Sequence, residues 1–229
     1  MLFRQLLDRE SGTYTYLLGC ETQRQAALID PVKEQLGLYL TLLEQLNYTL
    51  VAAIDTHVHA DHITALGALR QASSCATYVG APSSSPCASQ IYQEGEIIQI
   101  GEIALKAWHI LGHTDDSYSL VLADRVFTGD CLLIRGTGRV DFQNGNALQQ
   151  YASLQRLLTL PDETLVYAGH DYKGWTVSTI GEERQHNPRL QVRNAEEYAA
   201  LMRQLNLPNP KIMDVAVPAN RACGQILQS

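Results

Sequence analysis

Three histidines and an aspartate lie within six consecutive residues of this chain, in the segment His57-Val58-His59-Ala60-Asp61-His62. Polar side chains at this density are costly to bury unless they share a partner that satisfies them together. Neutral imidazoles and carboxylates are ligands that suit zinc, iron or manganese. The alternating His57 and His59 can reach one centre, and Asp61 and His62 can point at a neighbouring one. The chain is therefore expected to fold so that this segment meets a metal site.

Three further candidate ligands are far apart in the sequence: His113, Asp130 and His170. Each comes directly after a glycine and follows a predicted strand. Residues 49–55, before His57, form a continuous apolar run, which is the pattern of a buried strand. Loops at strand ends are where a rigid scaffold presents reactive groups. The sequence therefore predicts a metal centre assembled where several strands end.

Strands and helices are predicted in both halves of the chain. Strands are expected over residues 13–19, 25–30, 49–55, 76–79, 97–100, 103–108, 119–122, 125–128 and 164–167, and helices over residues 34–46, 63–71, 147–158 and 195–205. Such mixing favours an α/β layered fold. Because no linker rich in Gly, Ser or Pro divides the chain, residues 1–229 are interpreted as a single domain.

The charge balance and the apolar pattern exclude several classes of protein. A formal net charge of -7 argues against nucleic-acid binding, which needs a basic face. No apolar run comes close to the length of about 18 residues that a membrane span requires. Residues 1–10 resemble neither a secretory signal nor a transit peptide. A cytoplasmic protein is therefore expected. The five cysteines form no C-x-x-C pair, which predicts buried free thiols rather than a disulfide framework.

The pattern H-x-H-x-D-H, followed at long spacing by G-H, G-D and G-H, resembles the metallo-β-lactamase superfamily. This resemblance implies a four-layer αββα sandwich that holds up to two metals at one edge. The ligands it implies are His57, His59 and His113 for the first metal and Asp61, His62 and His170 for the second, with Asp130 between them. The nuclease, flavodiiron and true β-lactamase branches fit less well, because no basic surface, flavin domain or export signal is expected here.

Longer segments narrow the resemblance to the persulfide dioxygenase branch, the group of the ethylmalonic encephalopathy protein. The matching segments are Gly129-Asp130-Cys131 and onward to residue 145, His170-Asp171-Tyr172, and residues 176–179, 182–189, 206–208 and 216–220. They follow in order over nearly the whole chain. Two segments depart from the family's pattern: residues 115–116 after G-H-T, and residues 220–224 near the end. Neither contains an expected ligand.

The resemblance implies one Fe(II) per chain, held by His57, His113 and Asp130. Two histidines and one carboxylate on one face leave three metal positions open. An oxygenase needs such positions, since oxygen and a thiolate-like substrate must bind the same ion. The remaining polar residues would act in catalysis by orienting these ligands through hydrogen bonds or by supporting the site: His59, Asp61, His62, His170 and Tyr172.

The substrates implied by the resemblance are glutathione persulfide and O2, which would give sulfite and glutathione. Glutathione carries two carboxylates, and guanidinium groups bind carboxylates in a two-pronged geometry. The residues expected at the substrate are Arg135, Arg139, Tyr172 and Arg189. A homodimer is compatible with the sequence. Because no rhodanese-like segment is fused, a sulfurtransferase partner would be a separate chain.

The spacing of the ligands alone leaves two other functions open. The same residues could hold two zinc ions and activate a hydroxide that hydrolyses S-acylglutathione, as in glyoxalase II. That enzyme would be expected to carry a helical substrate domain at its C-terminus, and only about sixty residues follow His170. A non-catalytic sulfur- or metal-responsive binding protein is the third hypothesis. Open metal positions argue against it, because a pure binder does not need them.

Overall fold

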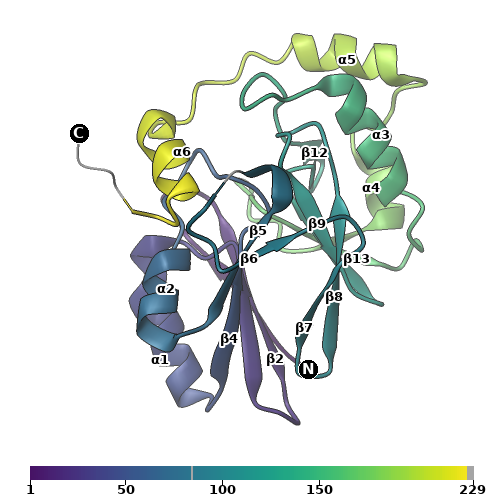
Figure 1. The fold of residues 1–229 in the computed structure, drawn as a ribbon. Coiled ribbons are helices and arrows are strands. Elements are labelled where there is room, and N and C mark those ends of the chain that lie inside the picture. Colours follow the sequence, from purple (N-terminus) through teal and green to yellow (C-terminus); the bar gives the residue numbers. More distant parts are fainter. Residues whose placement is uncertain (84, 226–229) are drawn as a thin grey trace.

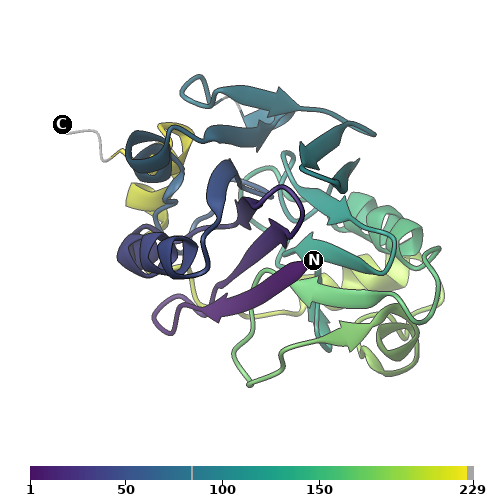
Figure 2. The same cartoon turned by 90° about the horizontal axis from the view of Figure 1, so that it is seen from below.

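The computed structural model describes residues 1–83 and 85–225, which contain two six-stranded sheets that face each other (Figures 1 and 2). The first sheet has the order β1 (Leu2–Leu7), β2 (Tyr14–Cys20), β3 (Gln25–Ile29), β4 (Thr49–Ile54), β5 (Ala76–Gly80) and β6 (Gln90–Tyr92). Its first two strand pairs are antiparallel and the other three are parallel. Parallel neighbours need crossover connections, and α1 (Leu36–Gln45) and α2 (Leu66–Ser73) lie in two of them.

The second sheet has the order β14 (Ser178–Thr179), β13 (Leu165–Ala168), β10 (Arg125–Gly129), β9 (Tyr118–Val121), β8 (Ile103–His109) and β7 (Ile97–Ile100). Strands β10 and β13 are parallel, and the other neighbours are antiparallel. A small hairpin of β11 (Leu132–Leu133) and β12 (Gly136–Thr137) follows β10. The crossover to β13 contains α3 (Ala147–Leu157).

Helices cover the outer faces of the two sheets and complete four layers (Figure 1). Helices α1 and α2 pack on the first sheet, with α6 (Met213–Arg221) beside them, and α3, α4 (Ile180–His186) and α5 (Ala195–Arg203) lie on the side of the second sheet. Between the sheets, alternate strand residues form an apolar core in which Tyr16, Phe127 and Tyr167 pack ring against ring. The αββα sandwich predicted from the sequence is therefore confirmed.

All the predicted strands and helices are present, with small changes at their ends. Helix α2 begins at Leu66 instead of residue 63, because residues 55–65 form an irregular loop that carries the histidines. The sequence did not predict β1, β6, α4, α6 or the short strands β11, β12 and β14. Helix α6 contains Pro218, and proline is unfavourable inside a helix because it lacks the backbone N–H. No helix in the described ranges is long and apolar enough to cross a membrane.

The cysteines correct the expectation of free thiols alone. Cys87, before β6, forms a disulfide with Cys223, which follows α6. The two residues are 136 positions apart, so no local spacing in the sequence could have indicated the bond. Cys20, Cys75 and Cys131 are buried and free, as predicted. The disulfide links the C-terminal helix to the segment that leads into the last strand of the first sheet.

Candidate metal centre

The polar residues identified in the sequence meet at one edge of the sandwich. Strand β4 leads into the loop of residues 55–65, which we call the histidine loop. Strands β8, β10 and β13 run in the same direction in the second sheet. Their carboxyl ends lead to His113, Asp130 and His170, respectively. The prediction that strand ends assemble the site is confirmed by this arrangement.

His57, His113 and Asp130 form a compact group, in which one possible ligand atom of each lies within 4.8 Å of the others. Nδ1 of His113 donates to the carbonyl oxygen of Arg139 at 2.8 Å. Because a carbonyl only accepts hydrogen bonds, this contact places the proton on Nδ1 and leaves the lone pair on Nε2. Nε2 lies 3.7 Å from Oδ2 of Asp130. These two atoms are therefore placed to share an ion.

Asp30, directly after β3, orients two residues of the histidine loop. Its Oδ2 accepts from the Thr56 hydroxyl at 2.9 Å, so that this hydroxyl oxygen can accept from Nδ1 of His57 at 3.0 Å. Its Oδ1 accepts from the Thr56 backbone N–H at 2.7 Å and from Nε2 of His59 at 3.1 Å. The proton of His57 then resides on Nδ1, and its Nε2 is available as a metal ligand.

Burial and neighbouring charges set the protonation states at this site. Burial, together with His59 and His113, holds the pKa of His57 well below its usual range. Burial would lower the pKa of His59, but the Asp30 carboxylate raises it to about 9. Burial would raise the pKa of Asp130, but His170 holds it well below its usual range. A neutral His57 and an ionised Asp130 are the forms that bind a metal ion.

His170 lies between two carboxylates. Its Nδ1 is 2.6 Å from Oδ1 of Asp130, and its Nε2 is 2.8 Å from Oδ2 of Asp61. Thr13 also contacts Nε2, at 3.0 Å. Burial would lower the pKa of His170, but Asp130 and Asp61 raise it well above its usual range. An imidazole that donates from both nitrogens has no lone pair for a metal, and here both ring nitrogens face carboxylates.

Two buried ring nitrogens in the histidine loop have no hydrogen-bond partner among the described residues: Nδ1 of His59 and Nε2 of His62. The ring centroid of His59 lies 4.2 Å from that of His57 and 4.3 Å from that of His62. Because buried polar atoms are normally paired, such nitrogens indicate a ligand. Together with the two imidazoles and the carboxylate of the compact group, they show that these residues fit a metal ion.

A cavity of about 610 Å³ opens over His57, His113 and Asp130. The residues that the sequence placed near the substrate all line it: Arg135, Arg139, Tyr172 and Arg189. Tyr172 is 75% exposed, and its ring stacks at 6.0 Å from that of His170. Their position at the cavity agrees with a role toward a substrate, and that role stays a prediction.

The three arginines at the cavity are already bound to groups of the protein. Arg135 forms ion pairs with Glu182 and Glu183. Arg139 holds the carboxylate of Asp141 with two nitrogens, at 2.7 and 2.8 Å. Arg189 donates to the carbonyl oxygen and the hydroxyl of Thr137. Two exposed lysines, Lys173 and Lys211, also line the cavity, and no ion pair of their ammonium groups is recorded within residues 1–83 and 85–225.

Several residues that organise the site had no role in the sequence analysis: Thr13, Asp30, Thr56 and Asn220. Thr13 contacts Asp61, His62 and His170 through one hydroxyl, at 3.0 to 3.1 Å. Asp30 could have been noticed, because it is the last residue of the strand predicted over residues 25–30, and in the structure it comes directly after β3. Thr13 and Asn220 come from distant parts of the chain, and although Asn220 ends the matching segment 216–220, no local pattern connects either residue with the histidines.

We predict that Gly138→Ala weakens metal binding roughly 10- to 100-fold, the usual effect of disturbing groups that orient ligands. A Cβ at this position would lie 2.2 Å from the carbonyl oxygen of Asp130 and 2.8 Å from Nδ1 of His113. Since a backbone atom cannot move aside alone, two candidate ligands would shift. A metal dissociation constant measured by competition with a chelator checks this.

Gly37→Ala is the matched control, because a Cβ at Gly37 in α1 would meet no atom within 4 Å. This variant should bind metal as the wild type does and melt no earlier, since alanine favours a helix. Equal metal affinity for Gly138→Ala and the wild type would contradict the close contact described for Gly138.

Comparisons with known proteins agree with the fold and the site. The family model described as the Metallo-beta-lactamase superfamily matches residues 8–170, which include the histidine loop, His113, Asp130 and His170. The chain therefore belongs to the metallo-β-lactamase superfamily.

Within this superfamily, the chain is similar to several proteins named as persulfide dioxygenases. The chain is 45% identical to "Persulfide dioxygenase ETHE1, mitochondrial" of Mus musculus and 44% identical to that of Homo sapiens, over 98% of this chain and 89% of each relative. A crystal structure of ETHE1 from Myxococcus xanthus is 55% identical, with a TM-score of 0.96 over 98% of this chain and 100% of that one. These matches place the chain in the persulfide dioxygenase branch, as the sequence motifs predicted.

Proposed function

We propose that this protein is a persulfide dioxygenase, which oxidises glutathione persulfide with O2 and water to sulfite and releases glutathione. The proposed cofactor is one Fe(II) per chain, held by His57, His113 and Asp130. The observation that supports a single ion is the position of His170, because both of its nitrogens contact carboxylates. When bound, ferrous iron would supply open positions for oxygen and for the persulfide sulfur, and the electron exchange between them.

The protein's own residues would fix the geometry of these ligands. The carbonyl of Arg139 holds the His113 ring, and Thr56 holds the His57 ring. His170 binds one oxygen of Asp130 at 2.6 Å and leaves the other directed toward His113. We propose that His59, Asp61 and His62 complete this support without binding the iron, and that Tyr172 shields His170 from the side of the cavity.

The cavity supports a substrate of the size of glutathione. Its volume of about 610 Å³ lies in the range of small-molecule sites. We propose that Lys173 and Lys211 attract the two carboxylates of the tripeptide, since their ammonium groups are exposed at the cavity. Arg135, Arg139, Arg189 and Tyr172 would shape the wall that receives the peptide. A homodimer, a cytoplasmic location and a separate sulfurtransferase that delivers persulfide remain part of the proposal.

Oxygen consumption tests the proposed function directly. Protein loaded with Fe(II) should take up dissolved oxygen when given glutathione persulfide, and sulfite should appear in an equal amount. Elemental analysis of protein purified without added metal should find one iron per chain. With S-lactoylglutathione the same preparation should release little thiol, because a single-metal site has no bridging hydroxide to attack the thioester.

A two-zinc thioesterase is the second candidate, and the unpaired nitrogens of His59 and His62 are the observation in its favour. In that enzyme His170 would have to release a carboxylate in order to bind the second ion. Two zinc ions per chain, rapid anaerobic hydrolysis of S-lactoylglutathione and no oxygen uptake with persulfide would establish the thioesterase and exclude the dioxygenase.

A further inference from the structure

Asn220 lies in the last turn of α6, and both polar atoms of its side-chain amide form hydrogen bonds with the backbone of the histidine loop. Its Nδ2 donates to the carbonyl oxygens of His59 at 2.9 Å and His62 at 2.8 Å. Its Oδ1 accepts from the backbone N–H of Thr64 at 2.9 Å. The side chain is 2% exposed, so water cannot replace these contacts. One residue thus satisfies three backbone groups of a loop that has no regular structure of its own.

Several contacts hold α6 and the residues after it in place. Ala216 and Ala219 pack against Ile63 of the histidine loop. The backbone N–H of Gly67 donates to the carbonyl of Cys223 at 3.0 Å, and Cys223 is joined to Cys87 by the disulfide.

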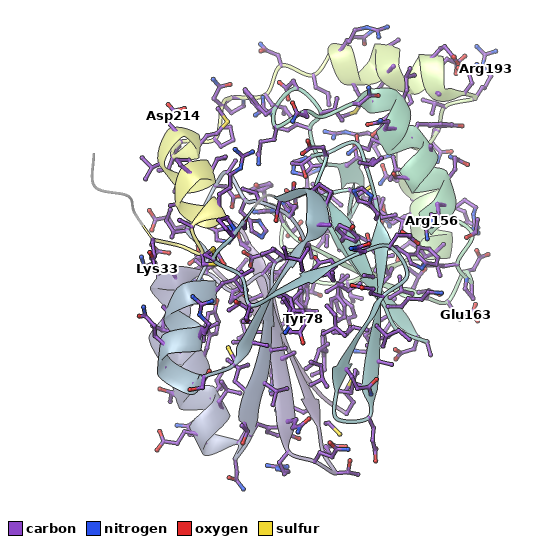
Figure 3. All side chains as sticks on the ribbon, viewed as in Figure 1. Lys33, Tyr78, Arg156, Glu163, Arg193 and Asp214 are labelled. Atoms are coloured by element: carbon purple, nitrogen blue, oxygen red, sulfur yellow. A yellow bond between two sulfur atoms is a disulfide. The ribbon has the colours of Figure 1, made fainter. Side chains whose placement is uncertain are left out.

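Lys33 binds the backbone just after the C-terminal end of α6. Lys33 donates from Nζ to the carbonyl of Gly224 at 2.7 Å. In Figure 3 the labels for Lys33 and Asp214 stand near opposite ends of α6. Asp214, near the start of the helix, is exposed. These contacts hold Asn220 in place next to the histidine loop through groups outside residues 59–62.

From this geometry we propose that Asn220 is a positioning residue of the metal centre. It acts through the backbone of residues 59–64 and keeps the loop in the conformation that places the ligand His57, and the supporting side chains of His59, Asp61 and His62, at the metal centre. Without the amide, two buried carbonyls and one N–H would lose their partners, and a loop without regular hydrogen bonds would rearrange to pair them. The inference rests on the proposed metal site but not on the identity of the oxidised substrate.

The test measures metal affinity in Asn220→Ala and Asn220→Asp with Co(II) as the probe, by chelator competition and by the visible spectrum of the bound ion. Both variants should bind Co(II) at least about tenfold more weakly than the wild type. Asn220→Asp retains an acceptor for the Thr64 N–H but loses the donors to the His59 and His62 carbonyls. It therefore distinguishes the effect of the donated hydrogen bonds from that of the accepted one. With iron, kcat should fall more than KM rises.

Leu43→Ala provides the control for a merely structural effect. Leu43 is buried in α1, in the core cluster outside the first sheet, so this variant should melt at a lower temperature yet bind Co(II) as the wild type does. Wild-type affinity in either Asn220 variant, with only a lowered melting temperature, would overturn the inference. A wild-type chain that binds no metal would instead overturn the proposed metal site, and the inference with it.

Discussion

Replacing Asp130 with alanine is expected to abolish metal binding and to reduce persulfide-dependent oxygen uptake by at least about a thousandfold. A metal ion contributes several kcal/mol to the stabilisation of a transition state, and each 1.4 kcal/mol is about tenfold in rate. Asp130 is the one carboxylate of the compact group and also a partner of His170. Without Asp130, only the imidazoles of His57 and His113 would remain as ligands of the compact group. The buried imidazolium of His170 would also lose one of its two carboxylate partners.

Elemental analysis and an oxygen electrode measure the two losses in the same preparation. Asp124→Ala is the control, because Asp124 is an exposed aspartate that pairs with Arg125 and lies at the opposite end of β10 from Asp130. This variant should retain the metal and the activity. Iron bound at one per chain in Asp130→Ala would contradict the proposed ligand set.

The second large effect is expected for the stability of the fold, in Glu183→Ala. The carboxylate of Glu183 is 0% exposed and accepts from the Arg135 backbone N–H, Ser178 and Asn187, at 2.6 to 2.9 Å. It also pairs with the guanidinium of Arg135. Removal of one partner of a buried ion pair costs about 3–5 kcal/mol, and here the guanidinium of Arg135, whose side chain is 17% exposed, would keep only its ion pair with Glu182. Denaturant unfolding should show this decrease in the free energy of unfolding.

Glu182→Ala tests whether the loss of stability comes from the burial of the carboxylate or only from its charge. Glu182 pairs with the same guanidinium, but its side chain is 39% exposed, and exposed ion pairs contribute up to about 1 kcal/mol. Similar losses of stability in the two variants would show that burial is not the cause. If Arg135 instead serves mainly the substrate, Glu183→Ala would alter KM with little change in stability.

The pattern of strands and helices predicted an α/β layered fold and a metal centre at the strand ends, and the resemblance to the metallo-β-lactamase superfamily supplied the αββα sandwich and the assignment of ligands. Apolar runs such as residues 49–55 are long and regular, and the histidine loop follows one of them directly. Since the ends of strands are local features, each ligand could be located without knowledge of its neighbours. Single-domain organisation, the iron and the roles of the cavity residues stay predictions.

What the sequence could not predict are the contacts between distant segments. Whether an arginine binds a substrate or a neighbouring glutamate depends on the path of the chain, and Arg135 is paired with residues almost fifty positions away. The disulfide and the contacts of Thr13 are of the same kind. Helix α6 could not be predicted for another reason. Its internal Pro218 lowers the helical propensity of the segment, and tertiary contacts outweigh this effect in the fold.

The location of Asn220 also has a consequence for biosynthesis. It is 161 residues from His59, so on the ribosome, at about 5–20 residues per second, roughly 10–30 s pass between their additions. During that interval the carbonyls of His59 and His62 lack the amide that they bind in the folded protein. A nascent chain would therefore carry its histidines in a pliable loop until Asn220 has been added and α6 has docked against that loop.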